Sequence, residues 1–165
     1  MPSLEAGSRL DNITTSVNVY VRQEIANGLG HTVYYQGQER VGDLPERWVE
    51  ADLIPASAVS EVMTGSGTLT TWVECLLNLN CYERFGTGNT NLYTLINMVE
   101  DVRSKFLVST GIPVYDYDTA GKPWVASLMV WGRSDVNEVP VASDTGVKQI
   151  NISVPLRYYE VIATD

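Results

Sequence analysis

The chain has 165 residues, 44% of them hydrophobic and 19% charged, with a net charge of −9 at pH 7. This length suits one ordinary domain, and the composition is globular rather than disordered. Because 20 acidic residues face 11 basic ones and no basic run occurs, the sequence argues against tight nucleic-acid binding. No apolar run approaches the ~18 residues of a membrane span, and no secretory signal opens the chain. We therefore expect a soluble single domain over 1–165, made in the cytoplasm and without contact to a membrane.

The N-terminal part predicts a loose arm followed by a helix. Residues 1–8 are small and polar, so we expect a flexible arm there. Ser8 and Asp11 fit a capping box, and Gly28 and Gly30 supply a stop signal. Apolar residues between them recur every three or four positions, which is the helical period. They are Leu10, Ile13, Val17, Val21, Ile25 and Leu29. The sequence thus predicts a helix over about 9–28.

Two strands and two loops are expected next. Residues 31–35 are β-branched and aromatic, and 48–54 alternate between apolar and polar side chains, as a strand with one wet side does. Turn formers and charges mark 36–47 and 60–67 as loops. The alternation then continues over 68–85, about 60 Å if fully extended, whereas most strands have three to ten residues. We expect this strand either to bend near 78–80 or to extend beyond its own domain, where another subunit would pair with it.

The second half repeats the mixture of helix and strands. Leu92, Leu95, Ile96, Val99, Val102 and Phe106 form an apolar stripe that predicts a second helix. Strands are expected at 112–117, 124–133 and 147–162, with a long polar loop at 134–146. The order is α-β-β-β-α-β-β-β. This order favours an α+β fold, with an antiparallel or mixed sheet and two main helices packed on one face.

Residues typical of catalysis are sparse. The turn Gly86-Thr-Gly88 lies where a phosphate loop would lie, but it completes neither the dinucleotide nor the Walker pattern. His31 is the only histidine and has no nucleophile motif beside it. Asp116 and Asp118 suit a turn better than a cation site. Cys75 and Cys81 lie roughly 20 Å apart on one continuous strand, too far for a disulfide. We expect no enzyme activity, no catalytic residue, no cofactor and no metal.

The tryptophans give a more positive signal. Trp48 and Trp72 alternate onto the polar faces of their strands, and Trp131 ends another strand. Exposed aromatic residues are typical of protein contact surfaces, although a helix or second sheet covering them is an equal alternative. Candidate subunit-interface residues are these three tryptophans with their neighbours Glu74 and Arg133.

Four segments together resemble the tail terminator proteins of long-tailed bacteriophages. They are the first helix at 10–29, the strand, glycine-rich turn and helix at 82–106, the stretch 121–131 and the closing strand 147–162. The likeness covers most of the chain but is architectural, and no functional residue can be transferred by position. The extended 36–67 region departs from the pattern and would be an additional docking loop.

The resemblance implies a structural virion protein that forms a homo-oligomeric ring, typically a hexamer, at the head-proximal end of the tail tube. Its partners would be copies of itself, the tail tube protein and the head–tail connector protein, with DNA passing through an acidic lumen without specific binding. Two alternatives remain. One is another neck or tail component, such as a head-completion adaptor or a tube protein. The other, from a different class, is a small-ligand-binding domain or an enzyme that uses the Gly86–Gly88 turn.

Overall fold

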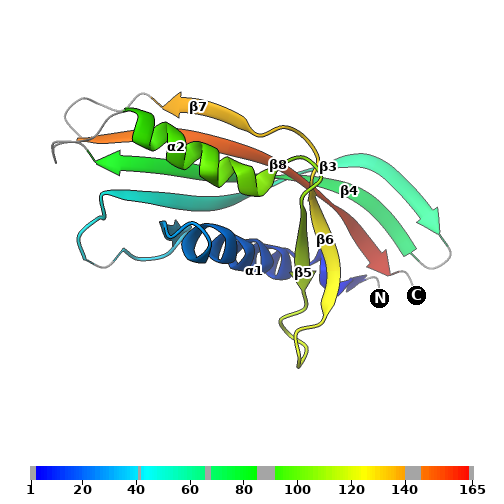
Figure 1. Cartoon of the computed structure of the whole chain (residues 1–165). Coiled ribbons are helices and arrows are strands. Elements are labelled where there is room, and N and C mark those ends of the chain that lie inside the picture. Colours follow the sequence, from blue (N-terminus) through cyan, green and yellow to red (C-terminus); the bar gives the residue numbers. More distant parts are fainter. Residues whose placement is uncertain (1–2, 41, 66–67, 85–91, 140–145, 164–165) are drawn as a thin grey trace.

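A mixed sheet of eight strands, with two α-helices, makes up the fold in the computed structural model of the chain (Figure 1). The structure describes residues 3–40, 42–65, 68–84, 92–139 and 146–163, with the backbone alone at 56–65, 68–69 and 92–93. This arrangement confirms the predicted α+β class. None of the helices in the described residues is long and apolar enough to cross a membrane.

Three long strands form the centre of the sheet: β3 (Arg47–Gly65), β4 (Thr68–Arg84) and β8 (Val147–Ala163). All 17 residues of β4 pair with β8 in unbroken antiparallel register. The bend expected near 78–80 is therefore absent, and the register shifts lie in β3 instead, between Pro55 and Met63. Since β3 fills the other edge of β4, this long strand pairs within its own chain and offers no edge to another subunit.

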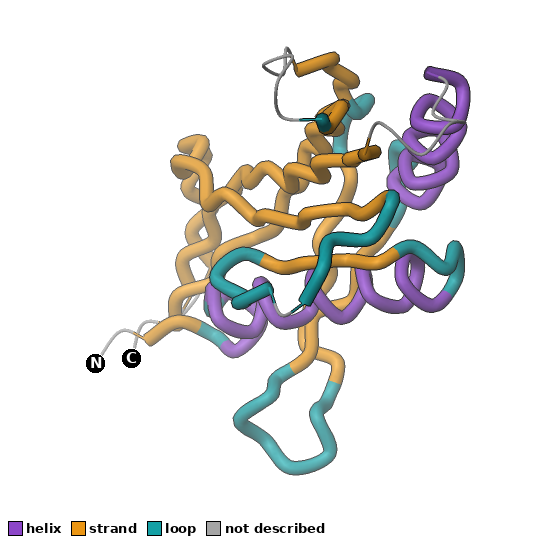
Figure 2. The backbone as a smooth tube through the Cα atoms, turned by 90° about the vertical axis from the view of Figure 1, so that its left-hand side faces the viewer, coloured by secondary structure: helices purple, strands orange, loops and turns teal. Residues whose placement is uncertain are grey.

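Shorter strands complete the two sides of this centre. The strand β2 (Thr32–Tyr35) runs parallel to the outer edge of β3. The outer edge of β8 is shared by β7 (Asp135–Val139), β6 (Trp124–Val130) and β1 (Ser3–Leu4), and β5 (Gly111–Tyr115) pairs with β6. The loop between β5 and β6 projects beyond the rest of the fold in both views (Figures 1 and 2).

Pro155 marks the point where β8 changes partners. Its neighbours Ser153 and Leu156 pair with β7 and β6 respectively. The carbonyl of Pro155 accepts a hydrogen bond from the Trp131 amide at 3.2 Å, so this residue faces the outer edge. Proline lacks the amide hydrogen that a continuous neighbour would need, and here it falls in the gap between two short strands.

Two helices pack against one face of the sheet. The first comprises α1 (Leu10–Val21) and a π-helical continuation at Arg22–Asn27, and the second is α2 (Leu92–Arg103), followed by a 3-10 turn at Ser104–Phe106. At Gly28 an added Cβ would lie 2.6 Å from the Glu24 carbonyl oxygen, so the end of the π-helical segment favours glycine. Both helices share one core with the strands. Its members include Ile13, Val17, Val21, Ile25, Leu95, Val99, Val102, Phe106, Leu77, Leu79, Ile152 and Val154.

The N-terminal segment is docked rather than loose. Ser3 and Leu4 pair with the end of β8, and Gly7 and Ser8 are buried in a 3-10 turn. The Ser8 hydroxyl accepts a hydrogen bond from the Val161 amide at 2.7 Å, so it is not free to cap the helix. The expected flexible arm at 3–8 and the Ser8–Asp11 capping box are therefore wrong. The N-cap is Arg9, which makes no side-chain capping bond.

Two expected loops also contain strand. Residues 60–65 belong to β3, and 135–139 form β7. Residues 36–40 and 42–46 lie in a loop, as predicted for 36–47, and Arg47 already begins β3. Both short strands, β1 and β7, escape a sequence reading because few residues alternate in them and because their exposed side chains carry no apolar pattern.

Candidate protein-interaction surface

The two faces of the central sheet differ sharply in burial. One face, which carries both helices, holds fully buried side chains such as Leu79 and Ile152. The opposite face, here called the open face, consists of the even-numbered residues 48–54 of β3 and 72–82 of β4 with the odd-numbered residues 149–159 of β8, which the strand register places side by side. Apart from Trp48, all of these are half-buried or exposed. The two described helices leave the open face uncovered.

Trp48 lies at one end of the open face and is only 2% exposed. Its ring stacks on Tyr82 with centroids 4.9 Å apart and an 11° interplanar angle, and its indole nitrogen donates to the Glu50 carboxylate at 3.2 Å. Glu50 also accepts from the Tyr82 hydroxyl and pairs with Arg40 of the 36–46 loop. Neighbouring groups thus cover Trp48, and its side chain adds almost nothing to the exposed surface.

Amides and a hydroxyl fill the middle of the open face. Asn80 accepts hydrogen bonds from the side chains of Gln149 at 3.0 Å and Asn151 at 2.8 Å, and the Ser153 hydroxyl donates to Asn78 at 3.1 Å. These cross-strand bonds satisfy one another and fix the pairing of β4 with β8. The ladder itself is uncharged, but Asp52, the strand partner of Asn78 on the same face, has a buried carboxylate oxygen without a hydrogen-bond partner. Contact of this region with another protein would therefore still remove an ion from water.

The other end of the open face carries a cation between aromatic rings, here called the Arg157 cluster. The guanidinium carbon lies 4.0 Å from the Trp72 ring centroid and 5.6 Å from that of Trp131. Tyr159 tilts against Trp72 at 4.0 Å, and Met129 is the strand partner of Arg157. The exposed fractions are 40% for Trp131 and 47% each for Met129 and Tyr159, so a hydrophobic rim surrounds the cation. Cation–π contacts of this kind stabilise the arginine by about 0.5–2 kcal/mol.

The predicted candidates thus separate into two groups. Trp72, Glu74 and Trp131 lie at the Arg157 cluster, since Glu74 is the strand partner of Arg157 on the same face. Arg133 is exposed just beyond Trp131, and Trp48 is buried at the far end. Arg157, Tyr159 and Met129 were not singled out from the sequence, although the alternation over 147–162 already assigns Arg157 and Tyr159 to one face.

The chemical groups considered from the sequence differ in their surroundings. Asp116 accepts from the Asp118 amide at 3.0 Å and from the Thr119 hydroxyl, which lowers its pKa, so the pair closes a turn. No group of three potential metal ligands occurs in the described residues. Burial lowers the pKa of His31. Cys75 and Cys81 are free, and burial raises both thiol pKa values to about 12. The Gly86–Gly88 turn lies outside the described residues.

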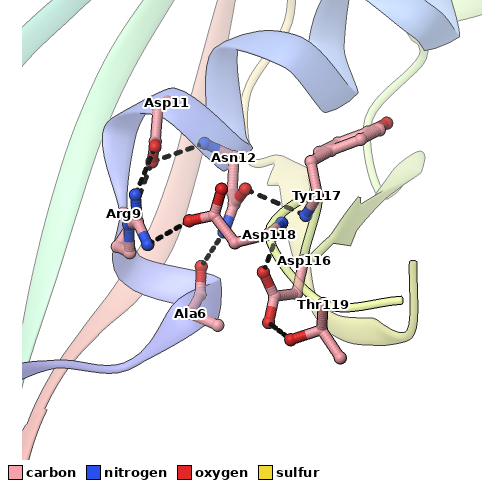
Figure 3. A network of polar contacts seen from close by, with 8 residues as sticks. All are labelled: Ala6, Arg9, Asp11, Asn12, Asp116, Tyr117, Asp118 and Thr119. Atoms are coloured by element: carbon pink, nitrogen blue, oxygen red, sulfur yellow. Dashed lines mark hydrogen bonds and ion pairs between the residues drawn. The ribbon is translucent and has the colours of Figure 1, made fainter. Parts of the chain in front are cut away.

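A polar network anchors the N-terminal turn to the loop between β5 and β6 (Figure 3). The Asn12 amide donates to the Ala6 carbonyl at 3.0 Å and accepts from the Tyr117 amide at 3.2 Å. Arg9 pairs with both Asp11 and Asp118, and these contacts raise the Arg9 pKa. The network satisfies its own donors and acceptors, which is typical of a structural joint rather than a ligand site.

Comparison with known proteins supports the fold alone. No protein-family model matches the chain, and no curated protein matches it. The chain is similar to a solved structure whose title names no function, with a TM-score of 0.56 and 12% identity over 90% of this chain and 94% of that one. The likeness therefore extends over nearly the whole of both chains.

Proposed function

We propose that the chain is a structural virion protein, a ring-forming tail terminator that caps the tail tube of a long-tailed phage and joins it to the head connector. The observation that carries this proposal is the open face. Three long strands present a face that the two helices leave uncovered, and the exposed rings of Trp131 and Tyr159 lie at its end. A surface of this kind favours assembly with protein.

Residue composition at the end of the open face supports a protein contact. Tryptophan, tyrosine and arginine are the residues most enriched at the energetic centres of protein interfaces, and all three meet within the Arg157 cluster. In the polar ladder beside it, the side-chain oxygens of Asn78 and Asn80 already accept hydrogen bonds from β8, so they keep these partners when a neighbour covers them. Both features favour a subunit that is completed by a neighbour.

Charge is compatible with a ring around DNA. The chain carries a net charge of −9, and phosphates are repelled by a surface of the same sign. DNA would pass such a lumen without binding. The virion location and the partners — tube protein, connector protein and further copies of this chain — are parts of the same proposal.

The proposal is tested by light scattering, which measures the mass of the purified chain in solution, alone and with the tail tube protein of the same phage. We expect a closed oligomer of defined subunit number in at least one of the two conditions. Leu76→Lys, in the middle of the open face, should reduce assembly while leaving the circular dichroism spectrum unchanged. Ile96→Lys, on the exposed side of α2, is the matched control and should assemble normally. A monomer in both conditions, or equal loss in both variants, would contradict the proposal.

Two further readouts separate the alternatives. Labelling the protein in intact particles and locating it by electron microscopy distinguishes a terminator at the tube end from a neck adaptor or tube protein. A clear rise in melting temperature with a nucleotide would favour the ligand-binding alternative instead.

A further inference from the structure

The Arg157 guanidinium is held by rings but has no acid to bind. Its Nε is buried and lacks a hydrogen-bond partner, and Arg157 forms no ion pair with the described residues. A buried donor of a charged group costs more to leave without an acceptor than a neutral donor does. The rings of Trp72 and Trp131 hold the guanidinium in place, and its two terminal nitrogens, which are not among the buried unpartnered atoms, can bind a carboxylate with two parallel hydrogen bonds.

We infer that the Arg157 cluster is a docking site for a carboxylate of a second copy of this chain, supplied by the 36–46 loop. This loop carries Glu39 and Asp43, both exposed and without an ion pair to the described residues. In contrast, Arg40 of the same loop already pairs with Glu50 and lies over the Tyr34 ring. The loop therefore presents unpaired negative charge, while the cluster presents unpaired positive charge within a hydrophobic rim.

The positions of loop and cluster favour contact between different copies. Arg40 joins the loop to the Trp48–Tyr82 end of the open face, and the Arg157 cluster lies at the Trp72 end. Ten residues of β4 separate Tyr82 from Trp72, about 33 Å for an extended strand. A carboxylate of the loop cannot reach Arg157 of its own chain across that distance. Head-to-tail contact between unlike ends closes into a ring when the rotation allows it, so this inference rests on the proposed function for its ring geometry.

Glu74 offers a rival explanation of the cation. It is the direct strand partner of Arg157 on the same face, and a rotamer change would bring the two together. If Arg157 served only to pair with Glu74 within the chain, Glu74→Gln would lower the stability of the fold. Substitutions of Arg157 would then leave self-association unchanged. Under the docking contact, Glu74 competes with the incoming carboxylate, and Glu74→Gln should leave association unchanged or strengthen it.

Charge exchange in trans tests the contact on the full chain. One variant carries Arg157→Glu, and the other carries Glu39→Lys with Asp43→Lys. Each alone should associate at least about tenfold more weakly than the wild type, because like charges meet at the contact. Mixed in equal amounts, the two should recover association, since every contact in an alternating assembly again joins opposite charges. Arg22→Glu, at an exposed arginine of the π-helical segment that follows α1, is the matched control and should associate as the wild type does.

The possible outcomes test the contact between Arg157 and the loop separately from the proposed ring assembly. Wild-type association with recovery on mixing supports the contact, and added salt should weaken it. A wild-type ring that Arg157→Glu leaves intact overturns the contact but not the proposed function. A closed dimer that depends on Arg157 and on the loop supports the contact and overturns the ring. No recovery on mixing, with both variants folded by circular dichroism, overturns the docking site.

Discussion

Replacing Asn12 with alanine should destabilise the fold although it removes only one small side chain. Asn12 is 2% exposed and joins two segments that lie far apart in the sequence, the N-terminal turn through Ala6 and the loop after β5 through Tyr117. Alanine would leave a carbonyl and an amide without partners. Each lost hydrogen bond costs about 1 kcal/mol, and more where the orphaned group stays buried. Against this, alanine favours a helix over asparagine by about 0.7 kcal/mol.

The expected net loss for Asn12→Ala is about 2 kcal/mol, which corresponds to a fall in Tm of about 4–8 °C for a chain of this size. Urea unfolding followed by circular dichroism gives the free energy directly. Asn18→Ala is the matched control, because it makes the same replacement in the same helix, where Asn18 has no side-chain hydrogen bond to the described residues. It should be neutral or slightly stabilising. If both variants unfold within about 0.5 kcal/mol of each other, the proposed joint is not a source of stability.

Two further predictions concern packing and the thiols. At Gly7 an added Cβ would lie 2.6 Å from the Ala126 Cβ, so Gly7→Ala should lower stability by about 1–3 kcal/mol. Gly111→Ala, where no atom lies within 4 Å, should be tolerated, and equal melting temperatures for the two variants would contradict the close packing of the N-terminal turn. The thiol pKa of Cys75 and Cys81 is about 12 in the fold, above the ordinary value of about 8.5. Above that ordinary value the unfolded chain therefore loses thiol protons first, and stability present at neutral pH should fall from about pH 9 upward. Urea midpoints between pH 7 and 10 and the rate of reaction with a thiol reagent check this, and fast modification of the native protein at pH 8 would refute it.

Long elements were predictable because their side chains alternate with a clear period. The first helix, β4 and β8 all carry apolar residues at regular spacing, and their burial in one core follows from that spacing. Ser8 shows where the sequence misleads. A serine before a helix is a common cap, but here its hydroxyl binds the Val161 amide, 153 positions away in the chain. Such a tertiary partner leaves no local signal.

The candidate surface was predictable only in part, for a similar reason. Alternation assigns Trp72 and Glu74 to a polar face, yet it does not show that no helix covers them. Trp48 has the same pattern and is buried, because Tyr82 and the Arg40–Glu50 pair lie over it. Arg157 gains its character from Trp72 and Trp131 on two other segments, so its importance appears only once the strands are assembled.

The mass of the assembled particle tests the central claim most directly. Light scattering on the purified chain mixed with tail tube protein should show a closed complex. The mass that this chain contributes to the complex should be a whole-number multiple of 18.2 kDa. Arg157→Glu should reduce the amount of that complex, and Arg22→Glu on the helical side should not. A chain of 18.2 kDa that stays monomeric at high concentration, with or without tube protein, would contradict assembly through the open face.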